Sequence, residues 1–113
     1  MKAVEIKENI YWVGGIDWNI RNFHGYSTQR GTTYNAYLII DDKITLIDTV
    51  KNNLTYELIQ RISDIIDPSS IDYLISNHVE MDHSGSIPQI MKYASDATII
   101  TSPKGEKGLK AHY

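Results

Sequence analysis

The alternation of strand and helix patterns between residues 34 and 101 constrains the fold most strongly. Residues 34–40 and 43–47 are two apolar, β-branched runs separated by an Asp-Asp pair that suits a hairpin turn. Apolar residues then repeat at helical spacing over 54–66, and IDYLIS at 71–76 returns to a strand pattern. This order predicts an α/β fold of the α+β sandwich type, in which helices pack on a sheet.

The other sequence patterns add detail to this predicted fold. The runs LII and ITLI are apolar at nearly every position, so we expect both faces of the sheet to be covered. The aromatic- and Gly-rich stretch at 16–33 predicts a short strand and then a long loop, and such loops are often functional. The other predicted features are one strand over Val4–Val13, a tight turn at Gly14-Gly15, an N-cap at Asn53, a helix over 87–94 and a strand over 97–101.

The composition excludes several classes of protein. The chain has 113 residues, enough for one small domain, with 14 acidic against 11 basic residues and no basic patch, so nucleic acid is not an expected partner. No apolar run is long enough to span a membrane. Cysteine is absent, which excludes disulfides and thiolate metal sites and is compatible with a cytoplasmic protein. Any metal must therefore be held by imidazole and carboxylate groups.

Four potential metal ligands follow the strand at 71–76, in the stretch SNHVEMDHSG. Loops at the carboxyl ends of strands gather ligands in open α/β folds. In an extended segment alternate side chains point the same way, so His78 and Glu80 can reach one ion together. Asp82 and His83 lie where the chain turns towards the next helix and can reach a second ion. The remaining ligands of two closed sites must come from elsewhere in the fold.

The alternative for this stretch is a polar loop that caps a helix and binds nothing. For H-x-E-x-D-H placed directly after a buried strand, we favour metal binding. Imidazole and carboxylate ligands are compatible with zinc, iron or manganese. Glu80 adds negative charge that stabilises higher oxidation states, which favours a redox pair of irons over a hydrolytic zinc pair, although zinc also accepts glutamate.

Three stretches of the chain resemble the flavodiiron proteins, members of the metallo-β-lactamase-like superfamily. They are FHGYSTQRGTTYNAYLI, ITLIDTV and SNHVEMDHSGSIP. Most hydrolases of that superfamily carry H-x-H-x-D-H, and the flavodiiron proteins carry H-x-E-x-D in its place. The resemblance implies that residues 1–113 are the N-terminal part of a metallo-β-lactamase-like αββα domain. We expect the rest of that domain, and a flavodoxin-like FMN domain, beyond residue 113.

The resemblance also implies an activity. Flavodiiron proteins reduce dioxygen to water, nitric oxide to nitrous oxide, or both, at a non-haem di-iron centre that FMN supplies with electrons. A rubredoxin-like carrier reduces the FMN, and the functional unit is a head-to-tail homodimer in the cytoplasm. Two rival interpretations stay open: a dinuclear zinc hydrolase of the same superfamily, and a fragment that is inactive by itself.

Site residues carry over from the family by position. His78 and Glu80 would bind the first iron and Asp82 the second, while His83 matches a position that is a ligand only in some members. His24 and Tyr26, in the long loop, would approach the di-iron pocket, where His24 could donate to bound substrate; the alternative for His24 is a surface role. Asp48 either supports the metal segment or forms a simple cap, and we favour the support role.

Overall fold

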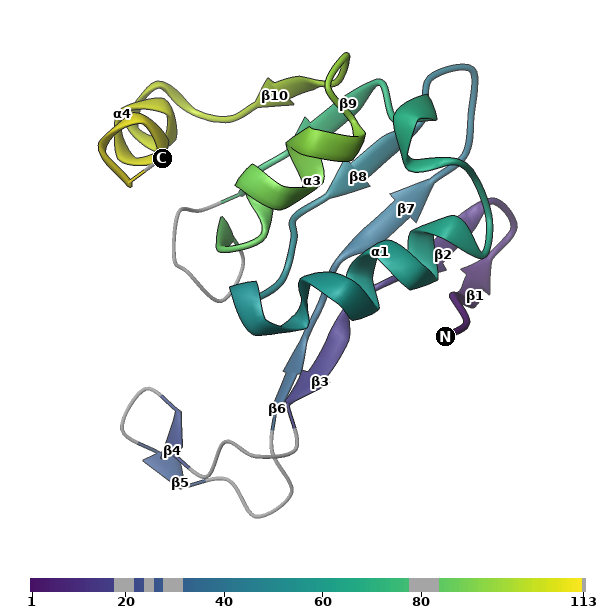
Figure 1. Cartoon of the computed structure of the whole chain (residues 1–113), viewed down its shortest axis with the longest axis horizontal. Coiled ribbons are helices and arrows are strands. Elements are labelled where there is room, and N and C mark those ends of the chain that lie inside the picture. The colour runs from purple at the N-terminus through teal and green to yellow at the C-terminus, as the bar shows by residue number, and fades with distance from the viewer. Residues whose placement is uncertain (18–21, 24–25, 28–31, 78–83, 113) are drawn as a thin grey trace.

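A mixed six-stranded sheet organises the chain, in the order β1-β2-β7-β8-β9-β10 (Figure 1). The computed structural model describes residues 1–17, 22–23, 26–27, 32–77 and 84–112. Neighbouring strands are antiparallel from β1 to β8, whereas β8, β9 and β10 run parallel. The strands are β1 (Val4–Lys7), β2 (Ile10–Trp12), β7 (Tyr37–Ile39), β8 (Thr45–Ile47), β9 (Tyr73–Ile75) and β10 (Thr98–Ile100).

Two helices connect the parallel strands and lie on the same face of the sheet (Figure 1). Neighbouring parallel strands need such crossover connections, because the chain has to return to the opposite end of the sheet before the next strand begins. None of the described helices is long and apolar enough to cross a membrane. The helical elements are η1 (Asn52–Leu54), α1 (Thr55–Ser63), η2 (Pro68–Ser70), α3 (Ile87–Tyr93) and α4 (Pro103–His112).

The core lies between the sheet and these helices. Leu38, Leu46 and Leu74 stand opposite one another in β7, β8 and β9, and all three are fully buried in one cluster with Leu58 and Ile62 of α1. Residues flanking them in the strands point to the other face and are half-buried. The expectation that both faces are covered is therefore met on one face only within the described residues.

The segment predicted as one strand over Val4–Val13 is a hairpin instead. β1 and β2 pair antiparallel around a turn in which Asn9 has φ 63°. Asparagine tolerates this left-handed conformation better than most residues, and it is the signal that the prediction missed.

Two small ladders, both antiparallel, extend from the main sheet. β3 (Gly15–Asp17) pairs with β6 (Thr32–Tyr34), and β4 (Asn22–Phe23) pairs with β5 (Tyr26–Ser27). The predicted tight turn at Gly14-Gly15 is wrong, because β3 already begins at Gly15. Gly14 is needed for close approach: a Cβ there would lie 2.0 Å from the carbonyl oxygen of Tyr34.

The start of α1 also differs from the prediction. Asn53 lies within the 3₁₀ turn η1, and the N-cap of α1 is Leu54, which makes no side-chain cap. The hydroxyl of Thr55 donates to the carbonyl oxygen of Asn52 at 2.7 Å, which ties the 3₁₀ turn to the helix. The helix therefore begins one residue later than an Asn53 cap would place it.

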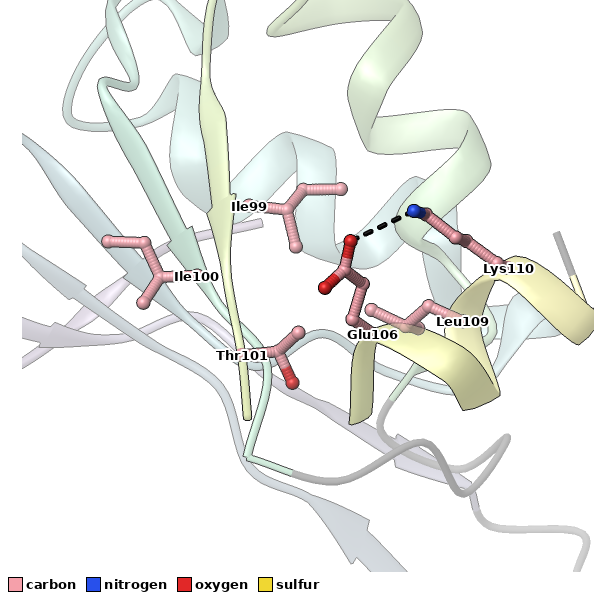
Figure 2. A pocket seen from close by; sticks show the side chains of 6 residues that line it. All are labelled: Ile99, Ile100, Thr101, Glu106, Leu109 and Lys110. Atoms are coloured by element: carbon pink, nitrogen blue, oxygen red, sulfur yellow. Dashed lines mark ion pairs between the residues drawn. The ribbon is translucent and has the colours of Figure 1, made fainter. Parts of the chain in front are cut away.

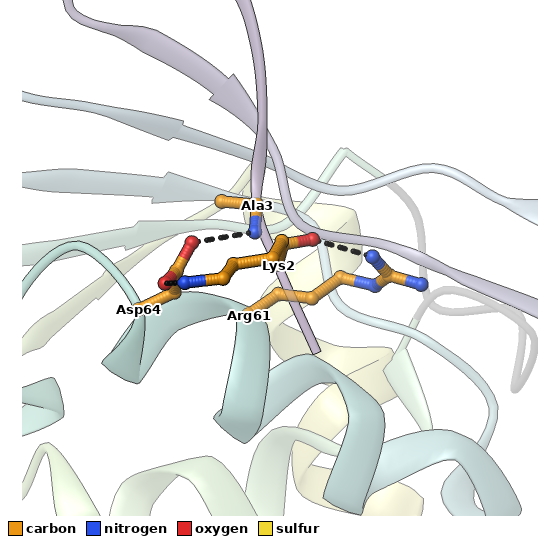
Figure 3. Close-up of polar contacts among 4 residues, drawn as sticks. All are labelled: Lys2, Ala3, Arg61 and Asp64. Carbon is orange, nitrogen blue, oxygen red and sulfur yellow. Dashed lines mark hydrogen bonds and ion pairs between the residues drawn. The ribbon is translucent and has the colours of Figure 1, made fainter.

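The N-terminal segment is held to α1 by polar contacts (Figure 3). The Asp64 carboxylate accepts from the Lys2 ammonium and from the Ala3 N–H, each at 3.1 Å. Arg61 donates to the Lys2 carbonyl oxygen, and its guanidinium lies 4.7 Å from the ring centroid of Trp12. The bond from Lys2 and then that from Ala3 lower the pKa of the Asp64 carboxyl.

Candidate metal centre

The predicted metal segment starts where two parallel strands end side by side. Ile47 at the end of β8 is in register with Ile75 at the end of β9. The next residues, Asp48 and Ser76, therefore lie at the same edge of the sheet. The edge formed by the carboxyl ends of parallel strands is where open α/β folds place their ligands.

Asp48 binds the first residues of this segment through both oxygens of its carboxylate. Oδ1 accepts the backbone N–H of Asn77 at 2.9 Å, and Oδ2 accepts its side-chain amide at 2.8 Å. The N–H of Asp48 donates in turn to the carbonyl oxygen of Ile75 at 2.8 Å. The carboxylate thus accepts from the backbone of this segment, as predicted, and holds Asn77, the residue before His78, with both of its oxygens. Support of the metal ligands themselves stays a prediction.

The backbone of Asp48 is strained. Its φ is 60°, in the left-handed region that disfavours residues with a Cβ, and only 9% of the residue is exposed. Strain of this kind persists only where the surrounding structure imposes it, and it gathers at functional sites. The residue that adopts this conformation is the one whose carboxylate accepts both hydrogen bonds from Asn77.

A hydrogen bond to β10 holds the first residue after β9. The N–H of Ser76 donates to the carbonyl oxygen of Ile100 at the end of β10, at 2.9 Å, and Ser76 is buried. The point at which the chain leaves β9 is thus bonded to both neighbouring strands.

The predicted ligands themselves, His78, Glu80, Asp82 and His83, lie outside the described residues, as does His24. Tyr26 is in β5, where its backbone pairs with Phe23, and its side chain is outside the described part. Among the side chains that the structure does describe, no three His, Asp or Glu residues gather closely enough to hold a metal ion. The assignment of these ligands stays a prediction.

The chemistry of the donor set fits a non-haem iron pair. The segment offers two imidazoles and two carboxylates, and the chain has no cysteine to supply thiolates. Ligand segments need outer hydrogen bonds that orient them, and Asp48 supplies these at the entry to this one.

A groove of about 500 Å³ opens beside β10 and α4 (Figure 2). Its walls are mainly apolar, and Glu106 and Lys110 form an ion pair across one turn of α4 at 2.9 Å. The hydrogen bond from Lys110 lowers the pKa of Glu106. This groove contains none of the predicted ligands, and its residues offer no convergent polar set, so it is not the candidate site.

Comparison with known proteins identifies the family. The profile described as "ODP family beta lactamase" matches residues 32–113. The nitric oxide reductase of Moorella thermoacetica is 53% identical over 99% of this chain and 29% of its own length.

Solved structures agree with this assignment. The rubredoxin oxygen:oxidoreductase from Desulfovibrio gigas superposes with a TM-score of 0.93 at 45% identity, over 98% of this chain and 28% of that one. The flavodiiron protein from Giardia intestinalis gives 0.94 at 36% identity, over 100% and 28%. The chain thus spans a little over a quarter of the length of these relatives. It belongs to the ODP family of β-lactamase-like domains, the part that it shares with the flavodiiron proteins.

Proposed function

We propose that this chain supplies one part of the di-iron centre of a flavodiiron oxidoreductase that reduces dioxygen, nitric oxide or both. Two relatives carry these activities in their names, a nitric oxide reductase and a rubredoxin-oxygen oxidoreductase. The observation that carries the proposal is the position of H-x-E-x-D-H directly after β9, at the strand end where Asp48 holds Asn77 with two hydrogen bonds.

The residues have distinct roles in this proposal. His78 and Glu80 bind the first iron and Asp82 the second, with His83 as a further candidate ligand. His24 and Tyr26 face the substrate, and His24 donates a hydrogen bond to it. When bound, two ferrous ions supply the electrons for the reduction of substrate. Asp48 orients the start of the ligand segment, because its carboxylate fixes both the backbone and the side chain of Asn77.

The remaining parts of the enzyme belong to the longer protein. We propose that further iron ligands and an FMN-binding domain come from outside these 113 residues, because the matched relatives are more than three times as long. A rubredoxin-like protein would donate the electrons, and the active form would be a head-to-tail homodimer in the cytoplasm.

Turnover of the full-length protein, loaded with iron and FMN under anaerobic conditions and then supplied with dioxygen or nitric oxide, tests this proposal. We expect two irons per chain and consumption of dioxygen or nitric oxide from a reduced rubredoxin. Glu80→Ala should lower the iron content and the turnover together, whereas Glu8→Ala, in the β1–β2 turn, should change neither. Zinc in place of iron, with esterase or lactamase turnover, would overturn the proposal in favour of a hydrolase.

A further inference from the structure

The chain is bonded to the rest of the fold again directly after the predicted ligand segment. Ser84, Gly85 and Ser86 are all buried. The N–H of Ser86 donates to the carbonyl oxygen of Val50 at 3.0 Å. The Ser86 hydroxyl lies 2.7 Å from that of Thr55, the first residue of α1, and 3.3 Å from the carbonyl oxygen of Lys51.

The two hydroxyls have two protons for three contacts, and the distances favour one arrangement. Each hydroxyl has one proton and two acceptor positions. Thr55 gives its proton to the carbonyl oxygen of Asn52 at 2.7 Å, so it accepts from Ser86. Ser86 therefore donates to Thr55, with the Lys51 carbonyl oxygen as a longer, secondary acceptor. The two hydroxyls form a directed chain that ends on the backbone of η1.

The Ser86 hydroxyl bonds Thr55 and does not cap its own helix. It is the N-cap residue of α3, a position at which serine normally accepts from a backbone N–H of the first helical turn. Ser86 makes no such side-chain cap. Its hydroxyl instead reaches the connection between β8 and α1, 31 residues away in the sequence. The contact thus replaces an ordinary cap with a long-range anchor.

The same connection holds both ends of the ligand segment. Asp48 accepts from Asn77 at the entry, and Val50 with Thr55 holds Ser86 at the exit. Because Asn77 and Ser86 are both bonded to residues 48–55, the conformation of this short stretch sets the distance between them. A metal centre requires its ligands to be held in place by such outer contacts.

We propose that Thr55 and Ser86 are positioning residues for the metal ligands, acting by anchoring the exit of the ligand segment to the β8–α1 connection. The proposal deepens the proposed function and rests on it for the role of His78–His83. It adds two residues that touch neither iron nor substrate.

Thr55→Val and Ser86→Ala in the full-length protein test the anchor. Valine keeps the shape of threonine without its hydroxyl, and Thr55→Ser keeps the hydroxyl. Thr45→Val, in β8 at the opposite end of the strand, is the matched control. Two properties are measured: anaerobic binding of ferrous iron, and amide hydrogen exchange of Ser84, Gly85 and Ser86 in the metal-free protein.

We expect Thr55→Val and Ser86→Ala each to weaken ferrous iron binding by about tenfold, the scale found for outer-shell partners of metal ligands. The double variant should be no weaker than the worse single variant, because both changes remove one interaction. Thr55→Ser should restore binding and Thr45→Val should leave it unchanged. Exchange of the three amides should rise in Thr55→Val, in Ser86→Ala and in the double variant, and it should stay unchanged in Thr55→Ser and Thr45→Val.

Unchanged amide exchange in Thr55→Val and Ser86→Ala would overturn the anchor. Faster exchange with unchanged iron binding would overturn the positioning role and leave a purely structural contact. If the unaltered protein binds no ferrous iron, the proposed function fails, and the exchange measurement still decides whether the hydroxyl pair holds this part of the chain.

Discussion

Asp48 combines a left-handed backbone with a carboxylate that accepts two hydrogen bonds from one residue. Aspartate takes this φ more readily than most residues with a Cβ, and its contacts here help to compensate for the strain that remains. The sequence indicates the role through position, because Asp48 closes the strand beside IDYLIS. The bidentate contact with Asn77, 29 residues away, is visible only in the folded chain.

Two substitutions of Asp48 should separate the effect of its left-handed backbone on stability from the effect of its hydrogen bonds. Asp48→Ala should lower the free energy of unfolding by about 2–4 kcal/mol, because it leaves Asn77 unpaired and keeps a Cβ at positive φ. Asp48→Gly loses the same bonds and relieves the strain, so it should be about 1 kcal/mol more stable than Asp48→Ala. Urea unfolding measures both, and a glycine variant less stable than the alanine variant would contradict this account.

Asp64 should make stability depend on pH. Its folded pKa lies below the ordinary value of 3.8 because Lys2 and then Ala3 donate to the carboxylate. A lowered pKa stabilises the fold above that ordinary value, and the contribution is lost as the pH falls through the folded pKa. Asp64→Asn should therefore be less stable than the unaltered protein at pH 7, by an amount that shrinks towards pH 3. Urea midpoints at both pH values test this, with Asp96→Asn, in an exposed turn, as the control.

At the scale of elements, sequence patterns predicted α1 and α3 and placed the ends of β8, β9 and β10 within two residues. The run predicted over 34–40 includes the last residue of β6 and all of β7, which begins three residues later. Each element buries one face, so its apolar residues recur at the period of a helix or a strand, and this period can be recognised in the sequence. Boundaries were less predictable. The 3₁₀ turn at 52–54 displaced the start of α1, and Asn9 divided the first predicted strand into a hairpin.

The buried face of α1 should dominate its contribution to stability. Leu58 is fully buried against the sheet, whereas Tyr56 is 70% exposed. Leu58→Ala should lower the free energy of unfolding by about 2–5 kcal/mol, through lost burial and the cavity that remains. Tyr56→Ala should change it by less than about 1 kcal/mol. Equal effects of the two substitutions in urea unfolding would contradict the observed packing of α1.

At the scale of the whole molecule, α1 and α3 form one layer on one face of the six-stranded sheet, and the residues of β7, β8 and β9 on its other face are half-buried. The relatives are more than three times as long, and the resemblance predicts that their remaining length completes both the domain and the ligand set. We therefore expect residues outside these 113 to complete the candidate metal centre.

The 113-residue chain and the full-length protein should differ in their affinity for iron. The 113-residue chain offers at most four predicted ligands to two ions, so water would complete most of the coordination. We expect it to bind ferrous iron at least tenfold more weakly than the full-length protein, because metal affinity depends on a preformed and complete ligand set. Anaerobic titration of both forms measures the difference, and equal affinities would show that the centre is complete within this chain.

The sequence by itself predicted the fold class and the family, and both are confirmed. The fold class follows from the periodicity of apolar residues, and the family follows from the resemblance of three stretches, one of which carries the predicted ligands His78, Glu80 and Asp82. The tertiary structure decided which residues support that segment. Asp48 meets Asn77 and Thr55 meets Ser86 only because β8 and β9 lie in parallel register under α1 and α3. Contacts between residues about 30 positions apart leave no periodic trace, so only the folded chain reveals them.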